Sequence, residues 1–236
     1  MEADDDGMYV LKFRGAGQGP KALIAELLAG EIARALGLPV PEIVFIDLDA
    51  DLARTEPDPE IQDLIRASAG LNLGLDYLPG SIMFDPVAEK LDARLASRIV
   101  WFDAYVTNVD RTPRNTNMLV WHRRLFLIDH GASLYFHHQW TNYRERIQDS
   151  FPRIKDHVLL QFADALAEVD CDMVEHLSPE AIVRLVRLIP DSWLVDDHSP
   201  LISDRCRDGY VEYLLNRLEP PHAFVEEAIR ARSLHL

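Results

Sequence analysis

The stretch FDAYVTNVDRTPRNTNMLVWHRRLFLIDHGASL, residues 102–134, decides the fold. Two apolar runs inside it, residues 118–121 and 125–128, are separated only by charged residues, which predicts a β-hairpin with its turn at Arg123–Arg124. A hairpin brings its two ends together, so oxygen ligands there would converge on one point, as a hard cation carrying phosphates requires. The carboxylates and amides at those ends are Asp110, Asn115 and Asn117 before the hairpin and Asp129 after it.

The composition indicates a folded, soluble protein. The 236 residues are 48% hydrophobic, enough for one large domain or two small lobes. The net charge of −15 argues against a nucleic-acid-binding surface and is typical of a solvated one. No apolar run approaches the ~20 residues of a membrane span, and MEADDDG is not a signal peptide, so we expect a cytoplasmic protein without a membrane partner. Cys171 and Cys206 lack CxxC spacing and are expected to be buried free thiols.

The first residues predict a strand followed by a helix. Asp6-Gly7 is a hairpin-turn signal before a strand at residues 8–13, and a helix is expected over residues 21–36. Lys12 shares a face with apolar residues, so it is either an edge lysine whose stem reaches water or a lysine turned inward. Glu26, on the margin of the apolar helix face, is either solvated or turned toward Lys12. Because so few residues precede the strand, we expect the chain to begin short of the natural start of its first sheet.

The remaining pattern runs from strands to helices. Strands are predicted at residues 39–48 and 71–78, with a surface excursion at residues 49–63 between them. A helix is expected to start at Asp85-Pro86 and to lead into the opening stretch. Four further helices are predicted at residues 150–169, 179–188, 201–218 and 223–233. A small mixed sheet with one helix, followed by helices, is an α+β two-lobe pattern, with residues 1–80 as the N-terminal lobe and 81–236 as the helical C-terminal lobe.

The order of these parts resembles a known arrangement. A strand lysine, a helix glutamate, a hinge strand, a loop with Asp and Asn, and a strand ending in DxG occur as YVLKF, AELLAGEIARALGLPVPE, LDYLPGS, NVDRTPRNTNML and LFLIDHGASL. This order resembles the protein-kinase-like fold of the HipA-like kinases and, more distantly, the phosphatidylinositol 3-/4-kinases. The resemblance covers residues 8–135. It implies an ATP- and Mg²⁺-dependent phosphotransferase that acts on a hydroxyl of a protein.

The resemblance also implies roles for single residues. Lys12 would hold the α/β phosphates of the nucleotide, and Glu26, with Glu31 as second choice, would hold Lys12 in place. Asp129 would bind Mg²⁺, and Asp110 would accept or orient the proton of the attacking hydroxyl.

Further residues belong to the same implied site. The hinge strand would offer Asp76 and Tyr77 to the nucleotide. A second metal ligand is Asn115 by its spacing from the catalytic aspartate, or Asn117 by its place before the apolar strand, and both remain open. Arg111 would contact phosphate or pair with the acidic surface, and Arg114 has the same two alternatives.

Two other functions are compatible with parts of the sequence. A catalytically impaired, nucleotide-binding kinase-like module acting through a protein partner is the first, because the phosphate-covering glycine loop is not found before Lys12. A metal-dependent hydrolase using Asp110, Asp129 and His130 is the second, but it leaves Lys12 unexplained. His137-His138 would face opposite sides of a strand, so we expect a surface or interface pair.

Overall fold

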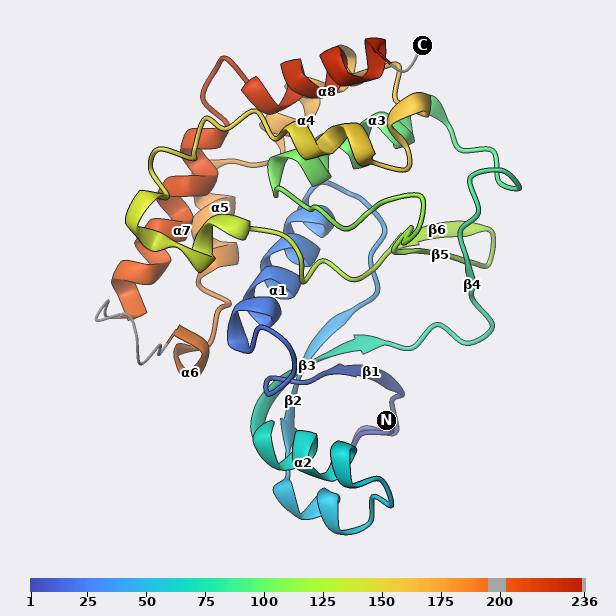
Figure 1. The fold of residues 1–236 in the computed structure, drawn as a ribbon, viewed down its shortest axis with the longest axis vertical. Coiled ribbons are helices and arrows are strands. Elements are labelled where there is room, and N and C mark those ends of the chain that lie inside the picture. The colour runs from blue at the N-terminus through green and yellow to red at the C-terminus, as the bar shows by residue number, and fades with distance from the viewer. Residues whose placement is uncertain (195–202, 235–236) are drawn as a thin grey trace.

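The computed structural model describes residues 1–194 and 203–234. Within these ranges the chain is an α+β protein with eight α-helices and two three-stranded sheets. Figure 1 shows the first sheet near the N-terminus, with α3, α4 and α8 gathered away from it and α1 between them. Helix α6 instead reaches the sheet through Trp193, whose Nε1 donates to the Leu71 carbonyl at 3.1 Å. In the same part of the chain, no helix is long and apolar enough to cross a membrane.

The first sheet has the strand order β1-β3-β2. Strands β1 (Tyr9–Lys12) and β2 (Ile43–Leu48) both pair antiparallel with β3 (Gly70–Asp76). The predicted mixed sheet is therefore wrong. Strands β1 and β2 run in the same direction, as a strand–helix–strand unit predicts, but β3 inserts between them and makes every pairing antiparallel. The hairpin turn predicted before β1 is confirmed by an antiparallel bridge from Glu2 to Met8.

Helix α1 (Pro20–Ala35) follows the prediction to within one residue at each end. Pro20 suits the first turn, because its missing N–H would have no partner there. The helix stops where Gly37 takes a φ of 69°, a conformation that glycine adopts without a side-chain clash. Ten residues of the helix, all those from Leu23 to Ala33 except Glu31, are buried, so α1 is an internal helix rather than a surface one.

A second helix in the N-terminal part was not predicted. Residues 49–63, expected as a surface excursion, contain a 3-10 helix (Ala50–Arg54) and the start of α2 (Pro59–Ala67). The Asp58 carboxylate caps α2 by accepting the Glu60 N–H at 2.8 Å, and Ile65 is its buried residue. The aspartate and proline that suggested a loop are Asp58 and Pro59, which instead begin helix α2.

The helix expected from Asp85 begins later. Asp85 accepts the N–H of Val87 at 2.8 Å within a turn, and α3 (Ala93–Tyr105) starts after Asp92, which accepts the Leu95 N–H at 3.0 Å. Val87 is 93% exposed, so a helix at that point would bury no apolar face. An aspartate does cap this helix, as predicted, but the capping residue is Asp92 rather than Asp85.

The predicted hairpin is present. Strands β5 (Met118–Trp121) and β6 (Arg124–Leu127) pair antiparallel, and β4 (Ile82–Met83) adds to β5. The turn residues are His122 and Arg123, with φ of 49° and 63°, one position earlier than expected. Positive φ at both positions is what the tightest hairpin turns require.

The C-terminal half is helical in most of its length. It contains α4 (Leu166–Glu175), α5 (Pro179–Val186), α6 (Asp191–Leu194), α7 (Ser203–Arg217) and α8 (Ala223–Ser233). Three of the predicted helices match α5, α7 and α8, although the first two residues of the predicted 201–218 helix lie outside the described ranges.

The helix predicted at residues 150–169 is wrong. Short 3-10 helices occupy Pro152–Asp156 and Leu160–Phe162 instead. Phe151 has a left-handed φ of 56°, which interrupts an α-helix, and the Val158 N–H donates to the Arg111 carbonyl at 3.1 Å. The segment therefore forms short turns, tied to a neighbouring loop by the Val158 bond, rather than one continuous helix.

Two smaller predictions also need correction. His137 is fully buried in a 3-10 helix (Tyr135–His138), with its Nδ1 2.9 Å from the Tyr210 hydroxyl, so it is not part of a surface pair. Cys206 is buried as expected, but Cys171 is exposed.

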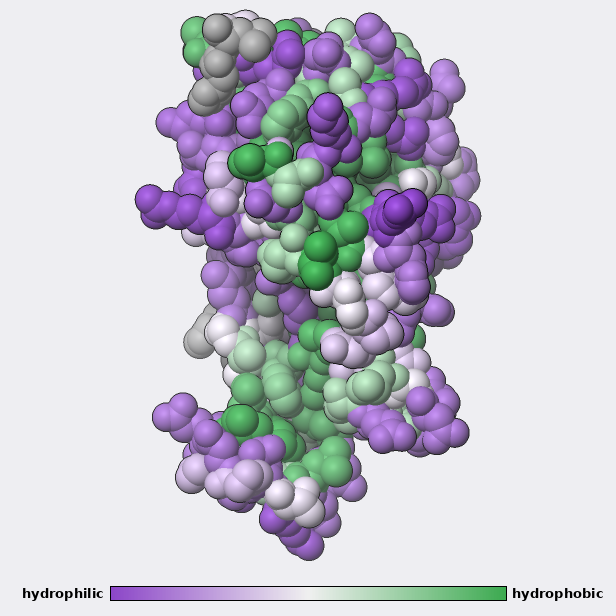
Figure 2. Space-filling model, turned by 90° about the vertical axis from the view of Figure 1, so that its right-hand side faces the viewer, coloured by the Kyte–Doolittle hydropathy of each residue, from purple (hydrophilic) through white to green (hydrophobic). Residues whose placement is uncertain are grey.

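Apolar side chains also reach the surface. Figure 2 looks onto the side of the molecule that carries β4 and shows a broken band of apolar surface there. Ile82 and Met83 of β4 are 62% and 54% exposed. The acidic composition thus does not mean a uniformly charged surface.

Candidate active site

Lys12 and Asp129 meet between the first sheet and the hairpin. Lys12, the last residue of β1, places its Nζ 2.7 Å from Asp129 Oδ1 and 3.7 Å from Glu26 Oε2. Glu26 is 1% exposed on the inner side of α1. Glu31 instead pairs with Arg34 at 3.2 Å. The inward alternative is therefore the one observed for both Lys12 and Glu26.

The Lys12–Glu26 pair is ionised despite its burial. Burial acts to raise the pKa of Glu26, but the neighbouring His130 imidazole and Lys12 ammonium outweigh it and lower the pKa to about 2. Burial likewise acts to lower the pKa of Lys12, and the charges of Glu26 and Asp129 leave it raised. A fixed ammonium next to an exposed carboxylate is the result.

His130 lies beneath this pair. Its ring is 1% exposed and packs edge-on against Phe102, with centroids 5.7 Å apart. Its Nδ1 is 3.6 Å from Glu26 Oε1, and neither ring nitrogen has a hydrogen-bond partner among the residues that the structure describes. The side chain therefore both packs, as an aromatic residue would, and presents polar atoms to Glu26.

Asp110 lies in the loop between α3 and the hairpin. Its Oδ2 accepts hydrogen bonds from Asn115 Nδ2 at 2.8 Å and Asn117 Nδ2 at 3.3 Å. Its Oδ1 accepts none from any residue that the structure describes. Both predicted asparagines thus meet Asp110, and this arrangement does not choose between them as metal ligands.

The hairpin brings Asp110 and Asp129 to the same end. Asn117, which contacts Asp110, accepts the N–H of Ile128 through its carbonyl at 3.0 Å, and Ile128 precedes Asp129. Asn117 and Asp129 have left-handed φ values of 47° and 58°. These conformations turn the chain sharply at both strand ends, so that polar side chains rather than strand continuations occupy this edge.

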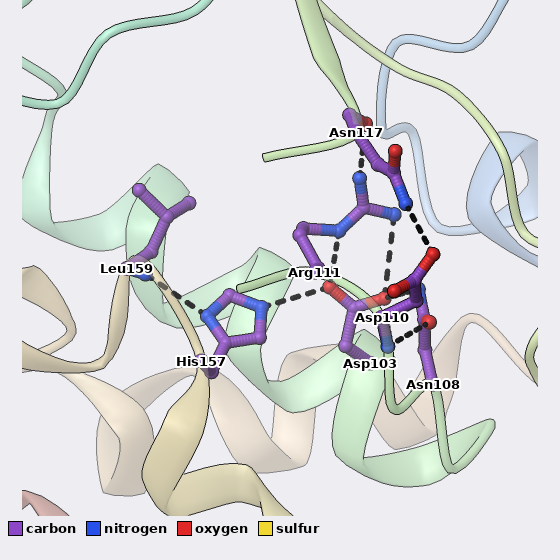
Figure 3. A network of polar contacts seen from close by, with 7 residues as sticks. All are labelled: Asp103, Asn108, Asp110, Arg111, Asn117, His157 and Leu159. Carbon is purple, nitrogen blue, oxygen red and sulfur yellow. Dashed lines mark hydrogen bonds and ion pairs between the residues drawn. The ribbon is translucent and has the colours of Figure 1, made fainter. Parts of the chain in front are cut away.

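A buried network holds the loop from below (Figure 3). Asp103 of α3 is fully buried and accepts from Arg111 Nε at 2.6 Å and Asn108 Nδ2 at 2.8 Å, and its Oδ2 is 2.9 Å from His157 Nε2. Arg111 also donates to the Asn117 carbonyl. Burial would raise the pKa of Asp103, but the charge of Arg111 and the bond to His157 hold it well below its usual range. One carboxylate thus joins α3 to both ends of the loop.

Sequence reasoning missed Asp103 and placed Arg111 differently. Arg111 is 1% exposed and its donors are directed to Asp103 and Asn117, not to solvent. The available signal was a lone carboxylate in the apolar run IVWFDAYV, since a charge buried there must find a partner.

A cavity of about 260 Å³ adjoins Lys12 and Asp129. Apolar side chains from both sheets form much of its wall, and Asp76 of β3 also lines it. Tyr77, its neighbour, is 44% exposed and not among the lining residues. Apolar walls with the Lys12–Asp129 pair beside them suit a ligand that has a flat ring and an anionic tail.

The donor set near the hairpin fits magnesium better than a protein-only metal site. Among the residues described, no group of three or more His, Cys, Asp or Glu side chains is placed to hold a metal ion. Mg²⁺ in phosphate-transferring sites takes one or two carboxylates and completes its shell with phosphates and water. Asp129 with an asparagine oxygen meets that requirement. The hydrolase alternative is weakened, because His130 faces Glu26 rather than Asp110.

Comparison with known proteins agrees with this arrangement. A family model described as HipA-like kinase matches residues 2–226. The chain belongs to the HipA-like kinase family. Searches of curated proteins and of solved structures returned no match. Membership confirms the resemblance in the sequence, extends it through the C-terminal helices, and indicates a kinase-like phosphotransferase that uses a nucleotide and a second substrate.

Proposed function

We propose that this HipA-like chain transfers the γ-phosphoryl group of ATP, with Mg²⁺, to a hydroxyl of a protein. The observation that carries the proposal is the state of Asp110: one oxygen is held by two asparagine amides and the other is without a hydrogen bond from the described chain. A carboxylate fixed on one side and available on the other suits a group that receives a proton. It stands at the same hairpin end as the Lys12–Asp129 pair.

The nucleotide would lie between two lobes, residues 1–80 and 81–236. Its base would occupy the apolar cavity beside Asp76, with Tyr77 at the exposed rim. Its phosphates would meet Lys12, which Glu26 keeps extended. Asp129 would hold Mg²⁺ with Asn117 or Asn115. The ion, when bound, neutralises the negative charge that spreads over the phosphates during transfer.

The proposed reaction moves one proton and one phosphoryl group. The acceptor hydroxyl gives its proton to Asp110 Oδ1 as its oxygen bonds to the γ-phosphorus. The bond from that phosphorus to the β–γ bridging oxygen breaks, and ADP leaves with the electron pair. The chain's contribution is placement and charge, because the transition state needs little covalent help from the protein.

The contact between Lys12 and Asp129 would change when a nucleotide binds. At 2.7 Å the ammonium neutralises the carboxylate that would otherwise bind the metal ion. Arrival of ATP with Mg²⁺ would move Lys12 toward phosphate and leave Asp129 to the metal. We assign Arg111 to positioning of the loop, in place of the predicted phosphate contact, because its guanidinium is enclosed by Asp103 and Asn117.

The test is transfer of label from γ-labelled ATP with Mg²⁺. Wild type is compared with Asp110→Ala, Asp129→Ala and a matched surface control, Asp63→Ala on α2. We expect label transfer or ATP turnover to fall by about 10²–10⁴ in the first two variants and to be unchanged in the control.

Other outcomes would favour the alternatives. Mg²⁺-dependent thermal stabilisation by ATP without turnover in the wild type would favour the impaired, partner-dependent module. Absence of any nucleotide effect, together with metal-dependent phosphoester cleavage, would favour the hydrolase and contradict the proposal.

A further inference from the structure

A second cleft, larger than the nucleotide cavity, lies beside the catalytic loop. It has a volume of about 630 Å³, and its walls come from residues 112–114 on one side and residues 153–161 on the other. Arg114, Arg153 and Lys155 line it, against one acidic residue, Asp156. The whole chain has 39 acidic and 24 basic residues, so this local excess of positive charge runs against the overall balance.

One wall of this basic cleft adjoins the reacting carboxylate. Thr112 and Asn115 exchange backbone hydrogen bonds of 2.9 and 3.1 Å and close a tight turn with Arg114 inside it. Asn115 then donates its side-chain amide to Asp110. Arg114 is therefore the chain neighbour of a residue that touches Asp110, and it is exposed.

The opposite wall is fixed to the same loop. The Val158 N–H donates to the Arg111 carbonyl at 3.1 Å, and His157 Nε2 lies 2.9 Å from Asp103 Oδ2 (Figure 3). The two walls are thus joined through hydrogen bonds beneath the cleft, which holds its shape before any ligand arrives.

The positive surface continues beyond the first cleft. A neighbouring cavity of about 610 Å³ shares Arg153, adds Arg146 and the acidic Asp149, and reaches Thr107 and Val109 just before Asp110. Arginine side chains therefore line the approaches to Asp110 on both sides of residues 150–153, with a smaller positive excess in the second cavity.

We propose that the basic cleft binds an acidic segment of the protein substrate, so that the acceptor hydroxyl lies among carboxylates or phosphorylated residues. This inference rests on the proposed function, because it names the substrate class of the same site. Arginine forms paired hydrogen bonds with carboxylate and phosphate groups, which favours an anionic ligand here. A hydroxyl a few residues along an extended chain from such contacts reaches the catalytic loop, since each residue spans about 3.3 Å.

The observations favour a protein segment over a nucleic acid. A net charge of −15 repels a long polyanion, whereas a short acidic peptide requires only local neutralisation. None of the residues that line the basic cleft is a Phe, Tyr or Trp on which bases would stack.

The test is binding of three fluorescent peptides, identical except that the central serine is flanked by Glu, Gln or Lys. Anisotropy is measured without nucleotide for wild type and for the double variant Arg114→Glu/Arg153→Glu. The matched control reverses two exposed arginines, Arg184→Glu in α5 and Arg187→Glu just after it. We expect wild type to prefer the Glu peptide, the first double variant to bind it about tenfold or more weakly and to prefer the Lys peptide, and the control to match wild type.

Three results would overturn the inference. They are equal binding of the three peptides by wild type, equal weakening by the control variant, and displacement of the Glu peptide by single-stranded RNA at lower concentration than by unlabelled Glu peptide. The single variant Arg114→Gln, with thermal unfolding measured alongside, gives the same comparison if the double variant does not fold.

The peptide-binding result can be distinguished from the result of the phosphotransfer assay. Asp110→Ala and Asp129→Ala should bind the Glu peptide as wild type does, because neither lines the cleft. Peptide binding that persists without label transfer from ATP would support the acidic ligand and reject the kinase activity. Label transfer that shows no preference among the three peptides would support the kinase activity and reject the acidic ligand.

Discussion

Two buried carboxylates in this protein have neighbours of the same kind, and their geometry differs. Asp103 meets an arginine and a histidine at 2.6 and 2.9 Å, and Asn108 completes its hydrogen bonds. Glu26 meets a lysine and a histidine at 3.7 and 3.6 Å, and within the described ranges its Oε1 has no hydrogen-bond partner. We call the cluster around Asp103 closed, because its carboxylate is fully hydrogen-bonded, and the cluster around Glu26 open, because its carboxylate is not.

The difference follows from what each cluster has to do. Buried polar groups without partners are costly, so a cluster that serves only stability satisfies them, as the one around Asp103 does. The cluster around Glu26 includes Lys12, which also contacts the exposed carboxylate of Asp129. A lysine that must shift between a carboxylate and a phosphate cannot be held as tightly as Arg111 is.

The largest expected effect comes from breaking the closed cluster. Asp103→Asn leaves the Arg111 guanidinium buried without its counter-charge, and we expect the free energy of unfolding to fall by about 3–5 kcal/mol. Urea denaturation measures it. Glu26→Gln is the matched variant and should cost less, because Lys12 keeps Asp129 and is 28% exposed in its side chain. Equal losses in the two variants would contradict the distinction between the clusters.

Acid should reveal the ionised state of the open cluster. The pKa of Glu26 is lowered in the folded state from 4.5 to about 2, so its contribution to stability is complete above the unfolded pKa and is lost as pH falls through the folded one. We expect the urea midpoint of wild type to fall between about pH 5 and pH 2 and that of Glu26→Gln to fall less steeply. Parallel profiles for the two proteins would show that Glu26 is not ionised when folded.

The smallest effect is expected for His130→Phe. The ring keeps its edge-on packing against Phe102, and two nitrogens without partners disappear, so the free energy of unfolding should change by less than about 1.5 kcal/mol. Glu26 loses a polar neighbour, and ATP affinity, measured by calorimetry, should decrease several-fold. A stability loss as large as that of Asp103→Asn would show that His130 is part of a closed network after all.

Features that depend on local pattern were predictable from the sequence. The β5–β6 hairpin follows from two short apolar runs with charged residues between them, and α1 follows from its proline start and glycine stop. The inward glutamate was one of two alternatives, because the side chain lies at the margin of an apolar face and only the tertiary contact with Lys12 decides its direction.

Features that depend on distant partners were not predictable in this way. Residues 150–169 have the composition of a helix, but their backbone forms short turns, and the Val158 N–H donates to the Arg111 carbonyl in the loop between α3 and β5. The run IVWFDAYV signals a buried carboxylate at Asp103, but it does not show that His157, 54 residues further on, is one of its partners. The same lack of long-range information led to a mixed sheet being expected, since the sequence does not show β3 entering between β1 and β2.

The backbone around the hairpin also has consequences for engineering. Thr107, Asn117, Asp129 and Leu134 all adopt left-handed conformations with φ between 47° and 58°. Such conformations cost roughly 1 kcal/mol or more each in residues other than glycine. Leu134 is buried in the core, so glycine there would lose more in packing than it gains in backbone freedom. Selection for thermostability alone would instead favour glycine at Asn117 and Asp129, the two side chains on which the proposed chemistry depends. A stabilised variant of this protein should be evolved with these positions held fixed.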